Sequence, residues 1–322
     1  MLDFPEPPKS YGSVFLEETD KPLPEKIDPR MRYAFFSTIA KGGKSLIKSC
    51  KDLHLSRFVC YKTLKPEFAD DKIEQKRLIR EARVTAMLQH PNTVPTYELG
   101  RDGRGNPYFT MKLVHGYTLR EILDYRDRYD LTQLVELILQ VGYALEYAHT
   151  HGVAHRDIKP ENILAGPYGE VLLLDWGLAK VWNPDGSSTA DSESNKTVEI
   201  KDISLTEAGK AQGTAHYMSP EQIDRDPAID HRTDIFSLGA VLYEILCGET
   251  PAQGEKLHEV ISSVQNDVPE LPSRLTRQRV PQLLQDVAMR SLEKDPARRY
   301  QSMAEVILLL QQDWWHELAP GN

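Results

Sequence analysis

Cysteine is scarce in this chain of 322 residues, which contains three: Cys50, Cys60 and Cys247. An odd and sparse set excludes a disulfide framework and is typical of a reducing compartment, so we expect a cytoplasmic protein. Long apolar runs are lacking as well, because runs such as Val306 to Leu310 are far shorter than the roughly 20 residues that cross a bilayer as a helix. The first residues also lack the basic and apolar regions of a signal peptide.

An excess of positive charge is lacking too. The chain has 39 Lys and Arg against 48 Asp and Glu, a net charge of −9, which argues against nucleic acid as a partner. What is present, 40% hydrophobic and 27% charged residues, is normal for a globular protein with a buried core. The length favours two domains.

The first 32 residues form a proline-rich extension. Six prolines between Pro5 and Pro29 oppose regular helix in this part of the chain. Two interpretations stay open: the extension is a loose tail, or it packs on the folded part that follows. In the second case its apolar anchors would be Tyr11, Val14, Phe15 and Leu16.

Beyond residue 32, aromatic and β-branched residues first predict strands, and helical periodicity prevails after Gly116. We expect strands at 33–39, 58–62, 93–99 and 108–113, and helices at 72–89, 131–151, 231–247, 281–293 and 302–316. The helix at 72–89 leaves Glu81 outside its apolar face, which consists of Ile73, Leu78, Ala82, Thr85 and Leu88.

The stretch 155–162, which reads HRDIKPEN, carries the clearest chemical signal. It places Asp157, Lys159 and Asn162 on one short segment. Phosphoryl transfer from ATP needs a carboxylate to accept the hydroxyl proton, a cation near the moving phosphoryl group, and an amide oxygen for a metal ion. The stretch therefore predicts a phosphotransferase site. We call residues 155–162 the catalytic loop.

Further landmarks appear in order along the chain, and the set resembles the eukaryotic-like (Hanks-type) serine/threonine protein kinases of bacteria. Lys159 stands where serine/threonine members of that family carry a Lys. Two motifs depart from the usual D-F-G and A-P-E, with Trp176 for Phe and Ser219 for Ala. The landmarks are VCYK at 59–62, Glu81, the catalytic loop, DWG at 175–177, SPE at 219–221, DIFSLG at 234–239 and KDPARRY at 294–300.

The resemblance implies an α+β protein with the bilobal protein-kinase fold. A small lobe at 33–113 would hold an antiparallel sheet and one main helix, and a larger, mainly helical lobe would span 114–318. Residues 175–221 would form the activation segment, with an insert near 183–209.

The resemblance also assigns roles and a cofactor. Asp157 would be the catalytic base and Lys159 would stabilise transferred charge, while Lys62, paired with Glu81, would hold the α- and β-phosphates of ATP. Asn162 and Asp175 would bind Mg²⁺, with Mn²⁺ as an alternative. Around the nucleotide, the resemblance places Ala40, Gly42, Gly43, Ser45, Ile47, Cys60, Lys62, Met111, Leu113, Val114, Leu164 and Leu174.

Two positions around the expected nucleotide are unusual. The glycine-rich loop G-x-G-x-x-G is reduced to AKGGKS at 40–45, with Ala40 and Ser45 in place of the outer glycines. Cys60 replaces the usual Ala, and residues two apart on a strand share a face, so Cys60 would lie beside Lys62. Cys60 is either a small apolar residue of the pocket or a thiol that a nucleotide mimic reaches.

The activation segment suggests that the chain phosphorylates itself. Its insert holds eight hydroxyl side chains, and the patterns do not rank them: Ser187, Ser188, Thr189, Ser192, Ser194, Thr197, Ser204 and Thr206. Arg156 would pair with a phosphate on this segment. The resemblance further implies that Thr214 contacts Asp157 and Lys159, and that Glu221 forms a structural ion pair with Arg299.

We therefore expect an ATP-dependent serine/threonine protein kinase that acts on proteins and on itself. The alternative is a pseudokinase or nucleotide-binding scaffold, which the reduced glycine loop, Lys112 and Trp176 favour. A small-molecule phosphotransferase of related fold is a weaker possibility, because those enzymes usually lack the Lys159 signature and the SPE segment.

Overall fold

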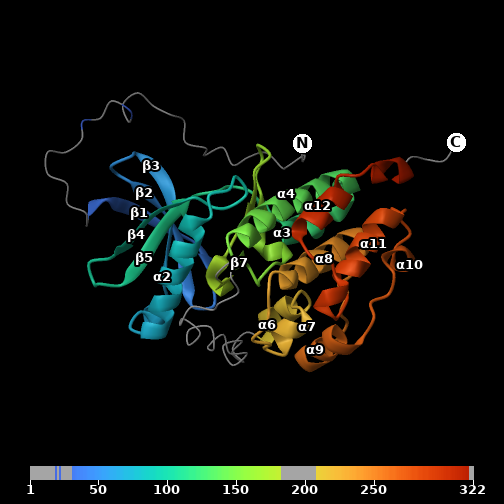
Figure 1. Cartoon of the computed structure of the whole chain (residues 1–322). Coiled ribbons are helices and arrows are strands. Elements are labelled where there is room, and N and C mark those ends of the chain that lie inside the picture. The colour runs from blue at the N-terminus through green and yellow to red at the C-terminus, as the bar shows by residue number, and fades with distance from the viewer. Residues whose placement is uncertain (1–18, 20–21, 23–30, 183–207, 319–322) are drawn as a thin grey trace. The chain divides into compact units, whose positions relative to one another are not determined.

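The computed structural model describes Thr19, Pro22 and residues 31–182 and 208–318. The described residues fall into two compact units that divide between Gly116 and Tyr117, close to the expected boundary between the lobes. Most of the proline-rich extension and of the insert in the activation segment lies outside the described residues, as the grey traces in Figure 1 show.

The first unit is built on an antiparallel sheet of five strands in the order β1-β2-β3-β5-β4. The strands are β1 (Tyr33–Lys41), β2 (Ser45–Asp52), β3 (Arg57–Leu64), β4 (Thr96–Arg101) and β5 (Pro107–Lys112). Helix α2 (Lys72–Met87) crosses one face of this sheet and packs against β3, β4 and β5 (Figure 1).

The alternation of side chains along β3 divides the core of this unit into two layers. Leu64 faces α2 in one cluster with Leu78, Ala82 and Phe109, and Lys62 projects from the same face of the strand. Val59 and Tyr61 belong to a second cluster with Cys50 and Tyr108. In that cluster the rings of Tyr61 and Tyr108 stack at 4.4 Å between centroids.

Helix α2 begins at its N-cap Asp71, whose carboxylate accepts hydrogen bonds from the backbone N–H groups of Ile73 and Glu74. The predicted apolar face is wrong at Ile73, which is 54% exposed. The buried positions of the first turn belong instead to Glu74 and Gln75. Both polar side chains find partners there: the Gln75 amide donates to the carbonyl of Ala69, and Glu74 forms ion pairs.

The second unit is mainly helical around α8, whose residues from Thr233 to Cys247 are all buried. Helices α4, α10 and α11 pack against α8. The helices are α3 (Leu119–Leu123), α4 (Leu131–Thr150), α6 (Ala208–Ala215), α7 (Pro220–Ile223), α8 (Arg232–Cys247), α9 (Leu257–Asn266), α10 (Pro272–Leu275), α11 (Gln282–Ser291) and α12 (Met303–Leu310). Short strands complete the unit: β6 (Tyr117–Thr118), β8 (Ile163–Ala165) and β9 (Val171–Leu173) pair in one sheet, and β7 (Val153–Ala154) pairs with β10 (Lys180–Val181).

Helix α4 leads the chain into the catalytic loop. It starts with a capping box between Asp130 and Gln133. It ends before Gly152, which has a φ of +70° and on which a Cβ would lie 2.3 Å from the carbonyl oxygen of Trp182. Only glycine fits this close approach, and the turn directs the chain into β7 and then into residues 155–162.

Several predicted elements differ in extent from the observed ones. The fourth strand begins at Thr96 rather than near Thr93, because the Thr93 hydroxyl closes a turn on the carbonyls of Leu88 and His90. The last predicted helix ends at Leu310, and a 3₁₀ turn over Trp314–Leu318 follows. Strand β2 and the helices α3, α6, α7, α9 and α10 were not predicted. Among the described helices, none is long and apolar enough to span a membrane.

Candidate active site

The first unit contributes a buried ion pair. The Nζ atom of Lys62 on β3 donates to Oε1 of Glu81 on α2 at 2.5 Å, and the two residues are 5% and 8% exposed. A buried charge is costly unless it is paired, so each residue fixes the other. The Lys62 ammonium is thereby held on the face of the sheet that α2 covers.

The expected nucleotide loop is a tight hairpin. Strands β1 and β2 join at Gly42, Gly43 and Lys44, and the Gly42 N–H donates to the Ser45 carbonyl at 3.0 Å. Ala40 lies on β1 and Ser45 on β2. A Cβ on Gly42 would approach the Ser45 hydroxyl to 2.7 Å, so any larger residue at the one position of the motif that retains glycine would make the Ser45 side chain rotate.

The remaining predicted nucleotide residues of this unit lie around β3 and β5. Ile47 pairs in register with Lys62, and Cys60 pairs with Met111. Met111 packs against the apolar cluster beneath α2, while Leu113 and Val114 follow β5 and are half-buried. Burial raises the pKa of the Cys60 thiol to about 12, so the thiol stays protonated. This favours the interpretation of Cys60 as a small apolar residue.

In the second unit, the catalytic loop brings three predicted residues together. The Lys159 ammonium donates to both carboxylate oxygens of Asp157, at 2.8 and 2.9 Å, and to the Thr214 hydroxyl at 3.1 Å. The Asn162 amide donates to the carbonyl oxygen of Asp157 at 2.7 Å and to its Oδ2 at 2.9 Å. The Asp157 carboxylate is therefore held from two sides.

The charge balance around Asp157 suits a base. Burial raises the pKa of its carboxyl group, the positive charge of Lys159 opposes this rise, and the negative charge of Asp175 adds to it, with a net increase above the ordinary value. A carboxylate whose pKa is raised holds a proton more readily than one in water. Asp157 is thus better suited to accept a proton from a hydroxyl group than an exposed Asp.

Asp234 at the start of α8 anchors the catalytic loop. Its carboxylate accepts the backbone N–H groups of His155 and Arg156, both at 2.8 Å, and lies 2.9 Å from Nε2 of His149. Burial is the largest influence on Asp234 and raises its pKa, but the contacts with His149, the charge of His155 and the backbone N–H of Arg156 together hold the pKa below its ordinary value. In the sequence Asp234 served only as a landmark of the DIFSLG motif, and its contacts with the backbone of the catalytic loop were not predicted.

Two residues of this candidate site have a left-handed backbone conformation. Arg156 has a φ of +70° and Asp175 a φ of +62°, and such conformations in non-glycine residues cluster at functional sites. The His155 ring, next to Arg156 in the chain, meets the ring of Trp176 edge-on at 4.5 Å, and Trp176 is 1% exposed. The replacement of Phe by Trp in the DWG motif is therefore accommodated inside the unit.

The oxygens that suit a divalent cation are those of Asn162 and Asp175. The Asn162 side chain donates through its nitrogen, which leaves its oxygen for a cation, and the Asp175 carboxylate is exposed. Among the described residues, no three His, Cys, Asp or Glu side chains gather as a preformed metal cage.

A donor set of two oxygens suits Mg²⁺, which keeps waters and takes its other ligands from substrate phosphates. Leu164 on β8 and Leu174, whose N–H donates to the Asn162 carbonyl, lie beside this pair.

Comparison with known proteins agrees with this geometry. Residues 33–315 match the protein kinase domain family. The chain belongs to the protein kinase family. The predicted fold class and the resemblance to bacterial serine/threonine kinases are thereby confirmed. Members of this family use ATP and a divalent metal ion.

Three relatives illustrate the similarity. A probable serine/threonine-protein kinase of Clostridium perfringens is 34% identical over 277 residues, 86% of this chain and 37% of the relative. The serine/threonine-protein kinase PknB of Mycolicibacterium smegmatis is 35% identical over 278 residues, 85% of this chain and 42% of the relative. PknD of Chlamydia caviae is 32% identical over 297 residues, 87% of this chain and 31% of the relative. The chain thus spans about two fifths or less of the length of these relatives.

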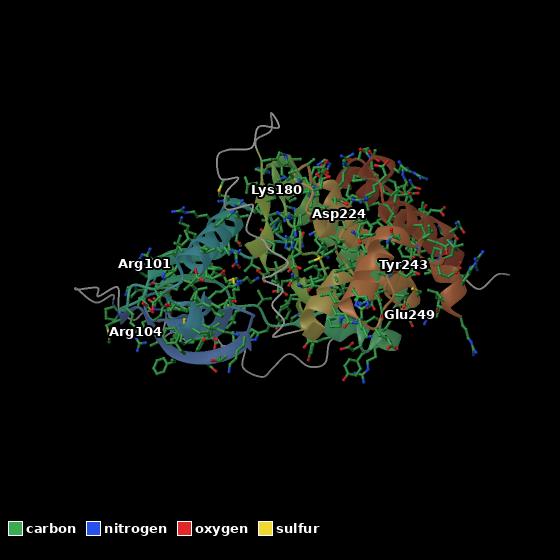
Figure 2. The ribbon with its side chains drawn as sticks, turned by 90° about the horizontal axis from the view of Figure 1, so that it is seen from below. Arg101, Arg104, Lys180, Asp224, Tyr243 and Glu249 are labelled. Atoms are coloured by element: carbon green, nitrogen blue, oxygen red, sulfur yellow. The ribbon has the colours of Figure 1, made fainter. Side chains whose placement is uncertain are left out.

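A second cation beside Arg156 was missed in the sequence of this kinase. Lys180 on β10 is labelled in Figure 2. Its ammonium donates to the carbonyls of Pro227 and Ile229 at 2.9 and 3.0 Å. Burial lowers the pKa of Lys180, and the positive charge of Arg156 lowers it further. The positive charges of Lys180 and Arg156 act in the same part of the unit and together favour an anion such as a phosphate group there.

Arg120 was missed as well. Its guanidinium donates to both oxygens of Glu244 on α8, at 2.6 and 3.2 Å, to Glu161 of the catalytic loop at 3.2 Å, and to the Tyr217 hydroxyl at 2.5 Å. It thereby links α3, the catalytic loop, α8 and the end of the activation segment of the kinase. No local pattern signals such a contact, because Arg120 and Glu244 are 124 residues apart.

The Ser in the SPE motif of the kinase has a structural reason. Ser219 is fully buried and is the N-cap of α7, where its side chain accepts the Gln222 N–H. Its hydroxyl also lies 2.7 Å from the Thr233 hydroxyl. An Ala at this position would leave the buried Thr233 hydroxyl without this neighbour.

We expect Ser219→Ala to lower the free energy of unfolding by about 1–2 kcal/mol, measured by urea denaturation. The matched control is Ser302→Ala, which removes the N-cap of α12 at a half-exposed position. The control should lose only the capping contribution, at the lower end of this range. Equal losses in the two variants would show that the bond to Thr233 contributes nothing.

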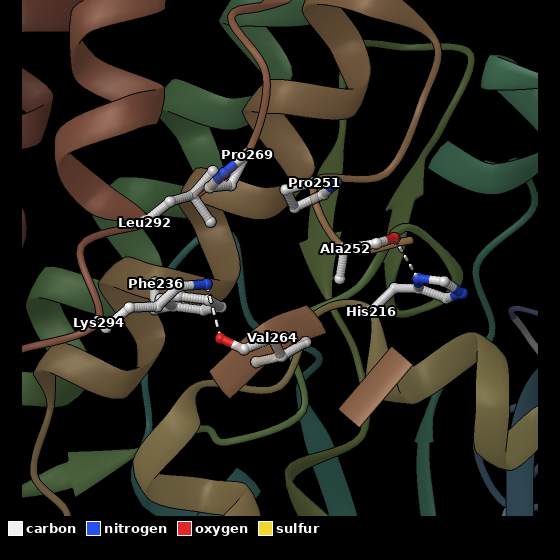
Figure 3. Close-up of a pocket in the computed structure, with 8 residues that line it drawn as sticks. All are labelled: His216, Phe236, Pro251, Ala252, Val264, Pro269, Leu292 and Lys294. Atoms are coloured by element: carbon white, nitrogen blue, oxygen red, sulfur yellow. Dashed lines mark hydrogen bonds between the residues drawn. The ribbon is translucent and has the colours of Figure 1, made fainter. Parts of the chain in front are cut away.

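A small cavity of about 10 Å³ lies elsewhere in the second unit, where α8, α9 and the segment before Ser219 meet (Figure 3). Lys294 donates to the Val264 carbonyl at 2.6 Å and His216 lies 3.0 Å from the Ala252 carbonyl. The space holds one water molecule at most, and no predicted catalytic residue lines it. It is a packing feature of the kinase rather than a second ligand site.

Proposed function

We propose that this kinase domain transfers the γ-phosphate of ATP to Ser and Thr hydroxyl groups of proteins. The observation that carries the proposal is the triad of Asp157, Lys159 and Thr214, because the carboxylate is only 10% exposed, is oriented by hydrogen bonds and is paired with a cation. Phosphoryl transfer asks a protein mainly for such positioning and charge compensation.

Each predicted residue then has one task. Asp157 accepts the proton of the substrate hydroxyl, and Lys159 stabilises the negative charge on the transferred group. Lys62, fixed by Glu81, holds the α- and β-phosphates. Asn162 and Asp175 hold Mg²⁺, with Mn²⁺ as an alternative, and the metal neutralises phosphate charge when it is bound.

We also propose that the kinase phosphorylates its own activation segment. Arg156 and Lys180 supply the adjacent cations that would bind the resulting phosphate. The three cysteines are free and buried, which supports the proposal that the domain works in the reducing cytoplasm.

The test is incubation of purified protein with γ-labelled ATP, a generic protein substrate and either Mg²⁺ or Mn²⁺. We expect label on Ser and Thr and not on Tyr, stronger with Mg²⁺, and we expect mass spectrometry to find sites between residues 183 and 209. Lys62→Met should abolish the label, while Lys76→Met, which changes an exposed Lys of α2, should not.

Three results would contradict the proposal. Binding of ATP without any transfer by the folded wild-type protein would identify a nucleotide-binding module. Absence of ATP binding would leave only a scaffold. Label in the Lys62→Met variant as strong as in the wild type would show that the phosphates are held elsewhere.

A further inference from the structure

Helix α2 carries two buried carboxylates, and each is paired with a Lys from the sheet side of its unit. Glu81 pairs with Lys62 at 2.5 Å, and Glu74 pairs with Lys44 at 3.0 Å. Seven residues correspond to two helical turns, so Glu74 and Glu81 lie on the same face, about 10 Å apart along the axis. The family resemblance anticipates the pair at Glu81, but nothing in the motifs anticipates the one at Glu74.

The second pair joins α2 to the turn of the nucleotide loop. Lys44 is the last residue before β2 in the turn at 42–44. Two carbonyls of this turn are also bound by Lys65, whose N–H donates to Lys44 at 2.9 Å and whose ammonium donates to Gly43 at 2.6 Å. The Lys44 ammonium lies 5.9 Å from the centre of the Phe68 ring. The turn is thus held by Lys65, through the carbonyls of Gly43 and Lys44, and by the ion pair of Lys44 with Glu74.

Burial makes the pair at Glu74 stronger than an ordinary surface contact. Glu74 is 6% exposed and takes a second cation, Arg77, at 2.6 Å. A carboxylate removed from water needs such partners, whereas two exposed side chains gain little from pairing. The side chain of Lys44 is 29% exposed, so it gives up part of its own hydration to reach Glu74.

We propose that Lys44 and Glu74 are positioning residues that hold the nucleotide loop against α2 before ATP binds. This inference rests on the proposed function, because it assigns the loop to ATP. A loop that keeps one glycine of the usual three can adopt fewer backbone conformations, so it adapts less well to the phosphates. A turn fixed in advance loses less conformational entropy when a ligand binds, so the brace compensates for the missing glycines. Because Glu74 and Glu81 belong to one helix, the brace also links the loop to the Lys62 pair.

The test compares Lys44→Met, Glu74→Gln and the double variant with the wild type. Calorimetry with ATP and Mg²⁺ should show each single variant binding about three- to tenfold more weakly, and the double variant no more weakly than the weaker single variant. Lys44→Arg should retain most of the affinity. Lys41→Met is the matched control, because it removes an exposed cation from the same loop.

A second measurement needs no nucleotide. Amide hydrogen exchange of the free protein should become faster at 42–46 and at 72–76 in Lys44→Met and in Glu74→Gln, and should stay unchanged in Lys41→Met. A merely local stabilising role for Glu74 would change exchange in α2 and leave the loop as it is.

Three results would overturn the inference. Unchanged exchange in the loop of Lys44→Met would show that there is no brace, whatever the protein does with ATP. Losses of ATP affinity that multiply in the double variant would show that Lys44 acts on the phosphates independently of Glu74. Faster exchange with wild-type ATP affinity would show that the pair only stabilises the fold. If the wild type itself does not bind ATP, the proposed function fails, and the exchange result still decides whether the brace exists.

Discussion

Replacement of Asp157 by Asn is expected to lower kcat for phosphoryl transfer by about 10²- to 10⁴-fold. The amide keeps the size of the side chain but cannot accept the hydroxyl proton, and it offers Lys159 no negative charge. The loop itself should stay in place, because its anchor on Asp234 uses the backbone of His155 and Arg156. The affinity for ATP should therefore change little.

The measurement is transfer of labelled phosphate to a protein substrate, with ATP affinity and thermal unfolding determined for the same preparations. Asp313→Asn is the control, since this Asp is exposed in the same unit. A variant at Asp157 that keeps more than about a tenth of the wild-type kcat would exclude Asp157 as general base. A variant that has lost both transfer and ATP binding would instead point to a disturbed site.

Replacement of Arg299 by Leu is expected to lower the free energy of unfolding of the second unit by about 3–5 kcal/mol. Arg299 is completely buried and donates to both carboxylate oxygens of Glu221, at 2.6 and 2.8 Å. The same guanidinium also donates to the carbonyls of Arg232, Glu293 and Lys294. Its loss would leave a buried carboxylate and three carbonyls without their donor.

Urea denaturation of wild type and variant measures this difference. The neighbouring Arg298 gives a matched control, because its side chain is 69% exposed and makes a surface ion pair with Glu293 at 3.2 Å. Arg298→Leu should cost about 0.5 kcal/mol or less. Similar losses at the two positions would mean that burial of the Arg299 pair is not what stabilises this part of the fold. The double variant Arg299→Met/Glu221→Leu should recover part of the loss, because it removes the unpaired charge.

The sequence predicted some of the contacts in the folded protein and missed others. The contact of Lys62 with Glu81 and that of Glu221 with Arg299 were expected because ordered motifs resemble a family with a fixed fold. The second pair joins residues 78 positions apart, and both expected contacts are present. The catalytic and nucleotide roles of these residues remain predictions. Local periodicity predicted strands and helices, but it did not predict which residue forms an ion pair with which.

The features that the sequence did not predict depend on packing between residues far apart in the chain. Ile73 satisfied the helical period and is nevertheless exposed, because the buried positions of that turn belong to Glu74 and Gln75. Arg120 and Lys44 are polar residues in segments without a charge pattern, and their partners are set only once the chain has folded. A search for polar residues at periods that predict burial would have found Glu74 and Asp234.

The anchor of the catalytic loop has a consequence for how this protein can vary. Asp234 binds the peptide N–H groups of residues 155 and 156, which every amino acid except proline provides. The position of the loop is therefore independent of the side chain at 156. An Arg at this position can be lost or regained without moving Asp157, so the proposed binding of phosphate by Arg156 and the position of Asp157 are free to evolve separately.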